Sequence, residues 1–307
     1  MLRALARHWP EYLMEAAGLG MPMVAVCSFS MLLFHPDSPV PQAIDNVIVR
    51  RLLMGIAMGC TAVFLVYSPW GKQSGAHFNP AVTLAYCRLG KVAGPDAVWY
   101  ALSQLSGALV GIGVMVVLFR GWLSHPAIHY VATMPGAWGA GVTWLAEFTM
   151  SLLLMTVVLA ASNSRQFARW TGVFAGLLTV ANVSVLVPLV GTSLNPARAF
   201  ASAVPAHVWR GIWVYLTAAP AGMLAAGALY VRRHGAAAVF CAKLHHQNSK
   251  RCIFCQMRAE QAAAGEDGSA CNPSLAAASN RGMSSTRSFP RTGRQEQFAC
   301  PTSATTT

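Results

Sequence analysis

The tripeptide Asn-Pro-Ala occurs twice in this chain, at Asn79-Pro80-Ala81 and at Asn195-Pro196-Ala197. Each copy follows a Gly-x-x-apolar lead-in, which begins at Gly75 in the first and at Gly191 in the second. A single copy would arise by chance in roughly one chain of this length in twenty, so two copies in one frame indicate an internal duplication. Asn is a favoured helix N-cap and Pro suits the first helical position. Each copy therefore predicts the start of a helix.

The composition is typical of a membrane protein. Apolar residues make up 55% of the chain and charged residues only 10%, against about 25% charged residues in soluble domains. A helix needs about 20 mostly apolar residues to cross a bilayer. The sequence therefore predicts an all-α membrane protein with six transmembrane helices. These are expected near residues 11–34, 50–68, 96–119, 142–162, 170–188 and 209–231.

Two further apolar stretches, residues 79–90 and 195–204, are about half that length and begin at the Asn-Pro-Ala motifs. Backbone that enters a membrane without crossing it is tolerated only where it is buried in protein or lines a cavity. We therefore expect two re-entrant half-helices. Paired short helices in two related halves mark the binding or conduction site of a membrane protein.

The doubled motif resembles that of the aquaporin (major intrinsic protein) family, in its bacterial type. The resemblance covers residues 11–232 and extends beyond the two motifs. Arg198 directly follows the second motif, as it does in that family. Glu15 and Glu147 match acidic residues of the family's first and fourth spans. The third span is similar through Tyr100-x3-Gln104-x2-Gly107.

This resemblance implies an inverted repeat, a central pore and a homotetramer. We divide the chain accordingly. The parts are a cytoplasmic N-terminal segment (1–10), a channel domain (11–232, with repeats at about 11–120 and 142–232), a Cys/His-containing cytoplasmic segment (233–258) and a tail (259–307). The tail has few large apolar residues and is expected to be largely disordered.

In such a pore, Asn79 and Asn195 meet near the membrane midplane and each offers an amide N–H to a passing molecule. Two helix N-termini would place about half a positive charge each at that point, which opposes cations and protons. Arg198 would line the outer constriction, because a charge inside a membrane is costly and usually functional.

The remaining filter positions depart from the water-selective pattern. Counting back from Asn195, Thr192 and Val183 fall at two of them, and the second span supplies Met58 or Gly59. Water-selective members usually carry His where this chain has Val183. The constriction is therefore expected to be less polar, which leaves room for small neutral solutes such as glycerol.

Three polar residues, Glu15, Gln104 and Glu147, interrupt apolar spans. We expect them to accept hydrogen bonds from backbone N–H groups of the re-entrant loops, which have no water to satisfy them. A proton relay is the alternative. His77 is expected at the inner pore mouth, with a purely structural role as the alternative.

Basic residues favour an orientation with both termini inside. The inner segments hold nine of them, Arg3, Arg7, Lys72, Arg88, Lys91, Arg165, Arg169, Arg232 and Arg233, and the outer segments hold Arg50, Arg51, Arg120 and Arg210. We expect a multi-pass protein of a bacterial inner membrane with cytoplasmic termini. Nucleic-acid binding is not indicated, because no basic-aromatic module accompanies the net charge of +12.

The segment after the last span contains Cys241-x3-His245-His246-x5-Cys252-x2-Cys255. Three thiols and one of the two imidazoles offer four ligands at spacings that resemble a small zinc knuckle. A reducing cytoplasm favours metal over disulfides. The alternative is a set of free thiols and histidines in a basic tail.

Two functions remain open from the sequence. The first is a passive channel for water and small neutral solutes that excludes protons and ions and needs no cofactor. The second is a poorly conducting membrane scaffold whose Cys/His segment acts as a binding module that responds to metal or to redox state. An enzyme is not predicted, because the chain has no nucleophile elbow, phosphate loop or His-Glu-x-x-His motif.

Overall fold

The structure, a computed structural model, describes residues 1–256, which form a helical bundle without strands. Six helical segments in this part of the chain are long and apolar enough to cross a bilayer. They are α1 (Leu2–Phe34), α3 (Val47–Tyr67), α6 (Gly94–Leu123), α7 (Gly139–Ser162), Ala168–Leu186 and α11 (Ile212–His234). The all-α fold with six spans is thus confirmed, while residues 259–307 lie outside the described residues.

The fifth span is composite. It joins the 3-10 turn η2 (Ala168–Trp170), α8 (Thr171–Ala181) and a π-helical turn, η3 (Asn182–Leu186), which runs on into α9 (Val187–Val190). A π-turn inside a helix is rare and is frequently found at functional sites. The sequence predicted the span but not this turn.

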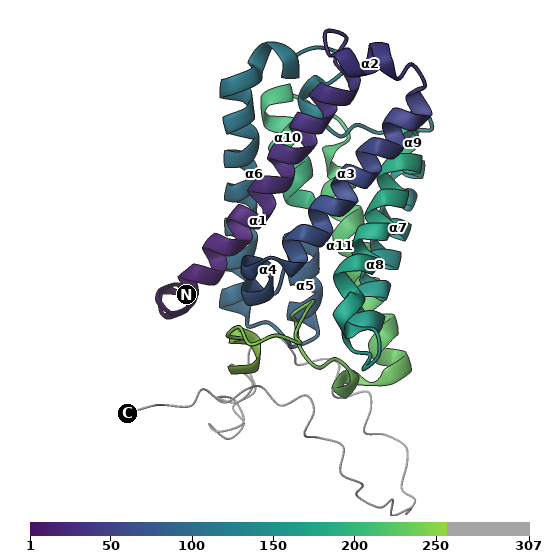
Figure 1. Ribbon diagram of the computed structural model, residues 1–307. Coiled ribbons are helices and arrows are strands. Elements are labelled where there is room, and N and C mark those ends of the chain that lie inside the picture. Colours follow the sequence, from purple (N-terminus) through teal and green to yellow (C-terminus); the bar gives the residue numbers. More distant parts are fainter. Residues whose placement is uncertain (257–307) are drawn as a thin grey trace, which may run out of the picture.

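The remaining short helices include the two that begin at the Asn-Pro-Ala motifs. These are α5 (Pro80–Arg88) and α10 (Pro196–Ala206). The others are α2 (Pro39–Ala43), α4 (Pro69–Ser74), η1 (His129–Val131) and η4 (Ala236–Ala238). Figure 1 shows α5 toward the end of the bundle that carries the N-terminus and α10 toward the opposite end. The half-helices therefore enter from opposite ends, as an inverted repeat requires.

Both half-helices begin in the way the motif predicts. The Asn79 side chain accepts a hydrogen bond from the Ala81 N–H, and the Asn195 side chain accepts one from the Ala197 N–H. The residue before each Asn has a left-handed backbone, with φ of 45° at Phe78 and 57° at Leu194. Such values are uncommon away from glycine. The same local strain in both halves supports the duplication.

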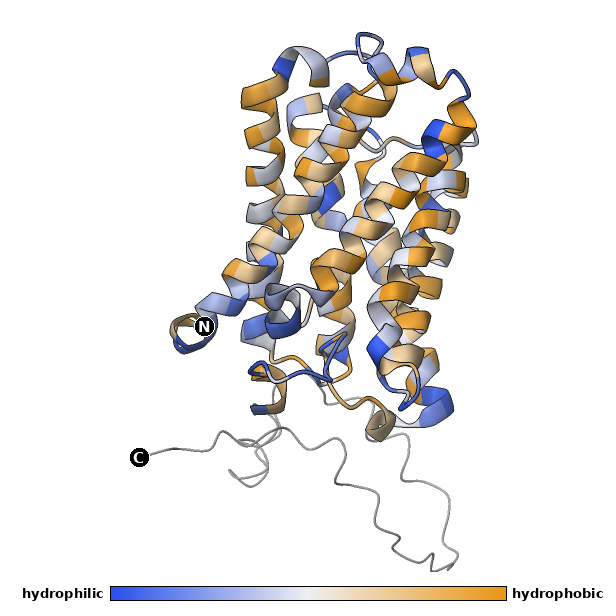
Figure 2. Ribbon diagram, viewed as in Figure 1, coloured by the Kyte–Doolittle hydropathy of each residue, from blue (hydrophilic) through white to orange (hydrophobic). Residues whose placement is uncertain are grey.

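Apolar residues make up most of the length of the long helices, and polar residues are more frequent toward the two ends of the bundle (Figure 2). The spans approach one another closely through glycines. A Cβ on Gly59 of α3 would meet the backbone of Gly176 on α8, and a Cβ on Gly111 of α6 would meet that of Gly20 on α1. In lipid, such close packing supplies much of the attraction between helices.

The first helix differs from the expected organisation. Residues 1–10 were assigned to a separate N-terminal segment, but α1 begins at Leu2 and continues through Pro10. A buried contact explains the extension. The Nδ1 atom of His8 lies 2.8 Å from a carboxylate oxygen of Asp96, which also accepts a hydrogen bond from the Tyr12 hydroxyl. These bonds fix the first turns of α1 against α6.

Candidate functional site

A cavity of about 510 Å³ lies inside the bundle. It follows one face of α3 from Arg51 to Leu65, which corresponds to roughly 20 Å of helix. Asn79, Asn195 and Arg198 all line it. A long internal cavity beside the meeting point of two half-helices is the geometry of a pore.

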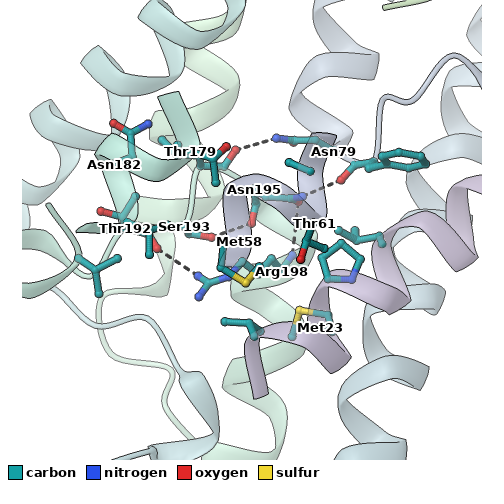
Figure 3. Close-up of a pocket in the computed structure, with 18 of the residues that line it drawn as sticks. Met23, Met58, Thr61, Asn79, Thr179, Asn182, Thr192, Ser193, Asn195 and Arg198 are labelled. Carbon is teal, nitrogen blue, oxygen red and sulfur yellow. Dashed lines mark hydrogen bonds between the residues drawn. The ribbon is translucent and has the colours of Figure 1, made fainter. Parts of the chain in front are cut away.

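The two motif asparagines bind each other's loops across the cavity. Nδ2 of Asn79 donates to the Leu194 carbonyl at 2.7 Å, and Nδ2 of Asn195 donates to the Phe78 carbonyl at 2.8 Å. Figure 3 shows this crossed pair. Because a side-chain amide carries two N–H donors, each asparagine retains one donor beyond its bond to the opposite loop.

Arg198 lines the same cavity one turn into α10. Its Nη1 atom donates to the Thr192 carbonyl at 3.1 Å, a bond drawn in Figure 3. A guanidinium has five N–H donors in a fixed plane, so one such bond orients the group and leaves donors for a solute. The positive charge therefore lies inside the bundle.

The structure distinguishes between the two residues considered on the second span. Met58 lines the cavity with Val183 and Thr192, whereas Gly59 packs against Gly176 of α8. Val183 lies in the π-turn η3. Three of the expected filter positions therefore line the same cavity as Arg198.

The two buried glutamates accept backbone hydrogen bonds from the re-entrant loops. Glu15 accepts from the N–H groups of His77 and Phe78 at 3.1 and 2.7 Å. Glu147 accepts from those of Ser193 and Leu194 at 2.7 and 2.9 Å. These contacts are the ones expected of two carboxylates that satisfy loop backbone in the absence of water.

Gln104 was expected to accept from the same backbone, and this expectation was wrong. Its Nε2 atom instead donates to the Glu15 carboxylate at 2.7 Å and to the Thr83 hydroxyl at 3.2 Å. The physical reason is that two loop N–H groups and the Ser74 hydroxyl already bind Glu15. The Glu15 carboxylate still has free lone pairs, and a charged acceptor is a stronger partner for the Gln104 amide N–H than a neutral one.

His77 is buried, lies in the loop between α4 and α5 and lines the cavity. Its Nδ1 atom lies 3.0 Å from the Thr83 hydroxyl and its Nε2 atom lies 2.8 Å from the Ala242 carbonyl. The second contact links the first re-entrant loop to the segment after the last span. The sequence placed His77 at the mouth but did not predict this partner.

Other polar residues of the cavity were missed. Thr61, Thr179 and Asn182 point into it with Met23 (Figure 3). Thr179 and Asn182 are three residues apart, so they share one face of the fifth span. Polar side chains at that spacing in an apolar helix were the available signal.

The predicted metal ligands converge, with one exception. The ligand atoms of Cys241, His246, Cys252 and Cys255 all lie within 4.8 Å of one another. His245 is outside this cluster and packs edge-on against the Tyr67 ring at 5.2 Å. Hydrogen bonds from the thiols of Cys241 and Cys255 lower the pKa of Cys252, which favours its thiolate.

The Major intrinsic protein family model matches residues 7–230. The chain belongs to this family. The match includes most or all of each of the six spans and both half-helices, and it ends before the Cys/His segment.

Curated relatives include a probable aquaporin NIP-type of Nicotiana alata, 33% identical over 57% of this chain and 63% of its own. Aquaporin NIP1-1 of Oryza sativa subsp. japonica is 34% identical over 58% of this chain and 61% of its own. Nodulin-26 of Glycine max is 32% identical over 58% and 64%. The chain thus spans less than two thirds of the length of these relatives. They come from plants, so they give no support to the expected bacterial inner membrane.

Among solved structures, the chain is similar to the aquaglyceroporin from Plasmodium falciparum, with a TM-score of 0.59 and 20% sequence identity. The match covers 73% of this chain and 95% of that one. At this identity the likeness establishes the fold.

Proposed function

We propose that this protein is a passive transmembrane channel that conducts water and small neutral solutes such as glycerol and excludes protons and ions. The observation that carries the proposal is the crossed pair of Asn79 and Asn195 beside a cavity that Arg198 also lines. Family membership supports the same reading. Conduction of this kind makes no covalent bond and needs no cofactor, so the protein is not an enzyme.

The asparagines would break the hydrogen-bonded chain of water along which protons move. The oxygen of a water molecule between them accepts hydrogen bonds from the asparagine N–H groups. That water therefore cannot at the same time accept a proton from the neighbouring water. The N-termini of α5 and α10 add a positive potential at the same point. The Arg198 guanidinium adds a second positive charge along the cavity, and this charge also repels cations.

The walls suit a solute with both a polar and an apolar side. Arg198 and Thr192 supply polar groups, while Met58 and Val183 supply apolar surface. A polyol can direct its hydroxyls to the first pair and its carbon chain to the second. We therefore propose glycerol-sized neutral solutes in addition to water.

We further propose that the N-terminus and residues 236–256, which lie at one end of the bundle, are cytoplasmic. The excess of basic residues assigned to that end supports the orientation. We call this the inner end. A homotetramer with one pore in each subunit is proposed from the family resemblance.

The test uses purified protein in proteoliposomes and stopped-flow light scattering after an osmotic shock. Both the full chain and a chain that ends after His234 are measured, because residues 239–256 contact the inner mouth. Liposomes that contain at least one of the two forms should shrink faster than empty control liposomes. They should also be more permeable to glycerol than the controls. A proton flux comparable to the water flux would overturn the exclusion of protons. If neither form conducts above the controls, the scaffold alternative is favoured.

A further inference from the structure

Residues 239–256 cross the inner end of the bundle beneath α4 and α5 (Figure 1). Apart from a final helical turn at 253–256 the segment is irregular, yet its apolar side chains are deeply buried. Val239, Ala242, Ile253 and Phe254 are each at most 2% exposed. Small folds with little regular structure commonly gain stability from disulfides or a structural metal.

The four converging ligands have the dimensions of a zinc site. In tetrahedral zinc coordination, metal–sulfur bonds of about 2.3 Å place neighbouring sulfurs about 3.8 Å apart. The Sγ atom of Cys241 lies 3.5 Å from that of Cys252 and 3.8 Å from that of Cys255. Nε2 of His246 lies 3.2 Å from the Cys255 sulfur. Three cysteines and one histidine are a common structural zinc set.

The same segment binds the first re-entrant loop of the pore. The Ala242 carbonyl meets Nε2 of His77 at 2.8 Å, and the Leu244 N–H donates to the Gly75 carbonyl at 3.1 Å. The Phe254 ring stacks on the His77 imidazole, with 5.5 Å between centroids and 4° between planes. Leu244 itself lines the cavity that contains Asn79 and Arg198.

Two further contacts fix the segment to opposite parts of the bundle. The Phe240 N–H donates to Oδ1 of Asn163, the C-cap of α7, at 2.8 Å. Arg251 donates to the Arg7 carbonyl in α1 at 3.1 Å. The segment therefore bridges the inner mouth rather than lying along one side of it.

The ligands bracket the residues that touch the pore. Ala242 and Leu244 lie between Cys241 and His246, and Phe254 lies between Cys252 and Cys255. A metal ion bound to these four ligands would close three loops, and every contact with His77 and Gly75 described above comes from the first or the last of them. Metal binding and docking at the mouth are thereby linked.

We propose that residues 239–256 bind one zinc ion through Cys241, His246, Cys252 and Cys255, and that the zinc-bound segment is a plug that narrows the inner mouth of the pore. Removal of zinc frees the loops between the ligands and opens the mouth. The zinc site stands on its own geometry, and the plug rests on the proposed channel function.

The first measurement is the metal content of the full chain, purified under reducing conditions. We expect about one zinc ion per chain, bound with sub-micromolar affinity, and thiolate-to-cobalt absorption when Co²⁺ replaces zinc. Cys252→Ser should lose both signals. Cys60→Ser is the matched control, because Cys60 is exposed on α3 and outside the cluster. Absence of the cobalt band, or iron or copper in place of zinc, would overturn the assignment.

The second measurement is water permeability in proteoliposomes. A membrane-permeant zinc chelator, Cys252→Ser and termination after His234 should each raise the permeability of the full chain several-fold, whereas Cys60→Ser should not. Leu244→Ala should raise it while zinc stays bound. Equal permeability in the zinc-loaded full chain and the shortened chain would overturn the plug. A shortened chain that conducts no faster than the full chain would overturn the plug alone. If neither form conducts faster than empty liposomes, the channel and the plug are both overturned, and the metal content would still decide the zinc site.

Discussion

Glu15 and Glu147 are equivalent residues in the two halves of this protein. Each carboxylate accepts hydrogen bonds from the two successive backbone N–H groups that come directly before an Asn-Pro-Ala motif. Both glutamates are fully buried. The geometry of the two re-entrant loops therefore depends on one acidic residue each, placed on α1 and on α7.

Removal of one of these carboxylates should damage both stability and conduction. Glu147→Ala leaves the N–H groups of Ser193 and Leu194 without their acceptor, and each such buried donor costs about 1–3 kcal/mol. We expect a lower melting temperature in detergent and a loss of water permeability.

Glu147→Gln is the matched variant, because its amide keeps one acceptor oxygen. It should lie between the wild type and Glu147→Ala in both measurements. An alanine variant with wild-type stability and permeability would show that the loop holds its shape without the carboxylate.

A larger side chain at Gly59 should destabilise the close contact between α3 and α8. Gly59→Leu would force atoms into the backbone of Gly176, and overpacking of this kind costs about 1–3 kcal/mol. We expect a clear fall in the melting temperature of the purified protein. Gly113→Leu on α6 is the control, because a Cβ there meets nothing within 4 Å. Equal melting temperatures for the two variants would contradict the close approach.

The parts of this structure that the sequence predicted are those fixed by short-range rules. Backbone in a membrane must satisfy its own hydrogen bonds, so apolar runs of sufficient length become spans. The Asn-Pro pairs cap their helices within three residues, as at Asn195 and Arg198. The equivalence of Glu15 and Glu147 follows from the duplication.

The parts that could not be predicted depend on contacts between distant residues. His77 and Ala242 are 165 positions apart, and no periodicity indicates that an irregular segment will dock on a re-entrant loop. The start of α1 depends in the same way on the contact between His8 and Asp96. The choice of His246 over His245 is decided by backbone direction, which ligand spacing alone does not give.

Arg198→Ala should make the channel less selective. The guanidinium lines the same cavity as Met58 and Val183 and supplies a fixed positive charge. Its loss should admit larger neutral solutes and raise leakage of cations, as measured by solute uptake and by ion flux in proteoliposomes. Arg210→Ala is the control, since Arg210 is exposed and does not line the cavity. An unchanged solute profile would place the constriction elsewhere.

Val183→His should narrow permeation toward water. The imidazole is larger and more polar than the isopropyl group, and it would replace part of the apolar surface that a polyol's carbon chain needs. One group of this size in an apolar site changes discrimination by about tenfold or more, so we expect glycerol permeability to fall by roughly that factor while water permeability changes little. Val185→His is the control, because Val185 is 62% exposed and does not line the cavity. If the wild type already rejects glycerol, or if both histidine variants behave alike, Val183 does not set the selectivity of the pore.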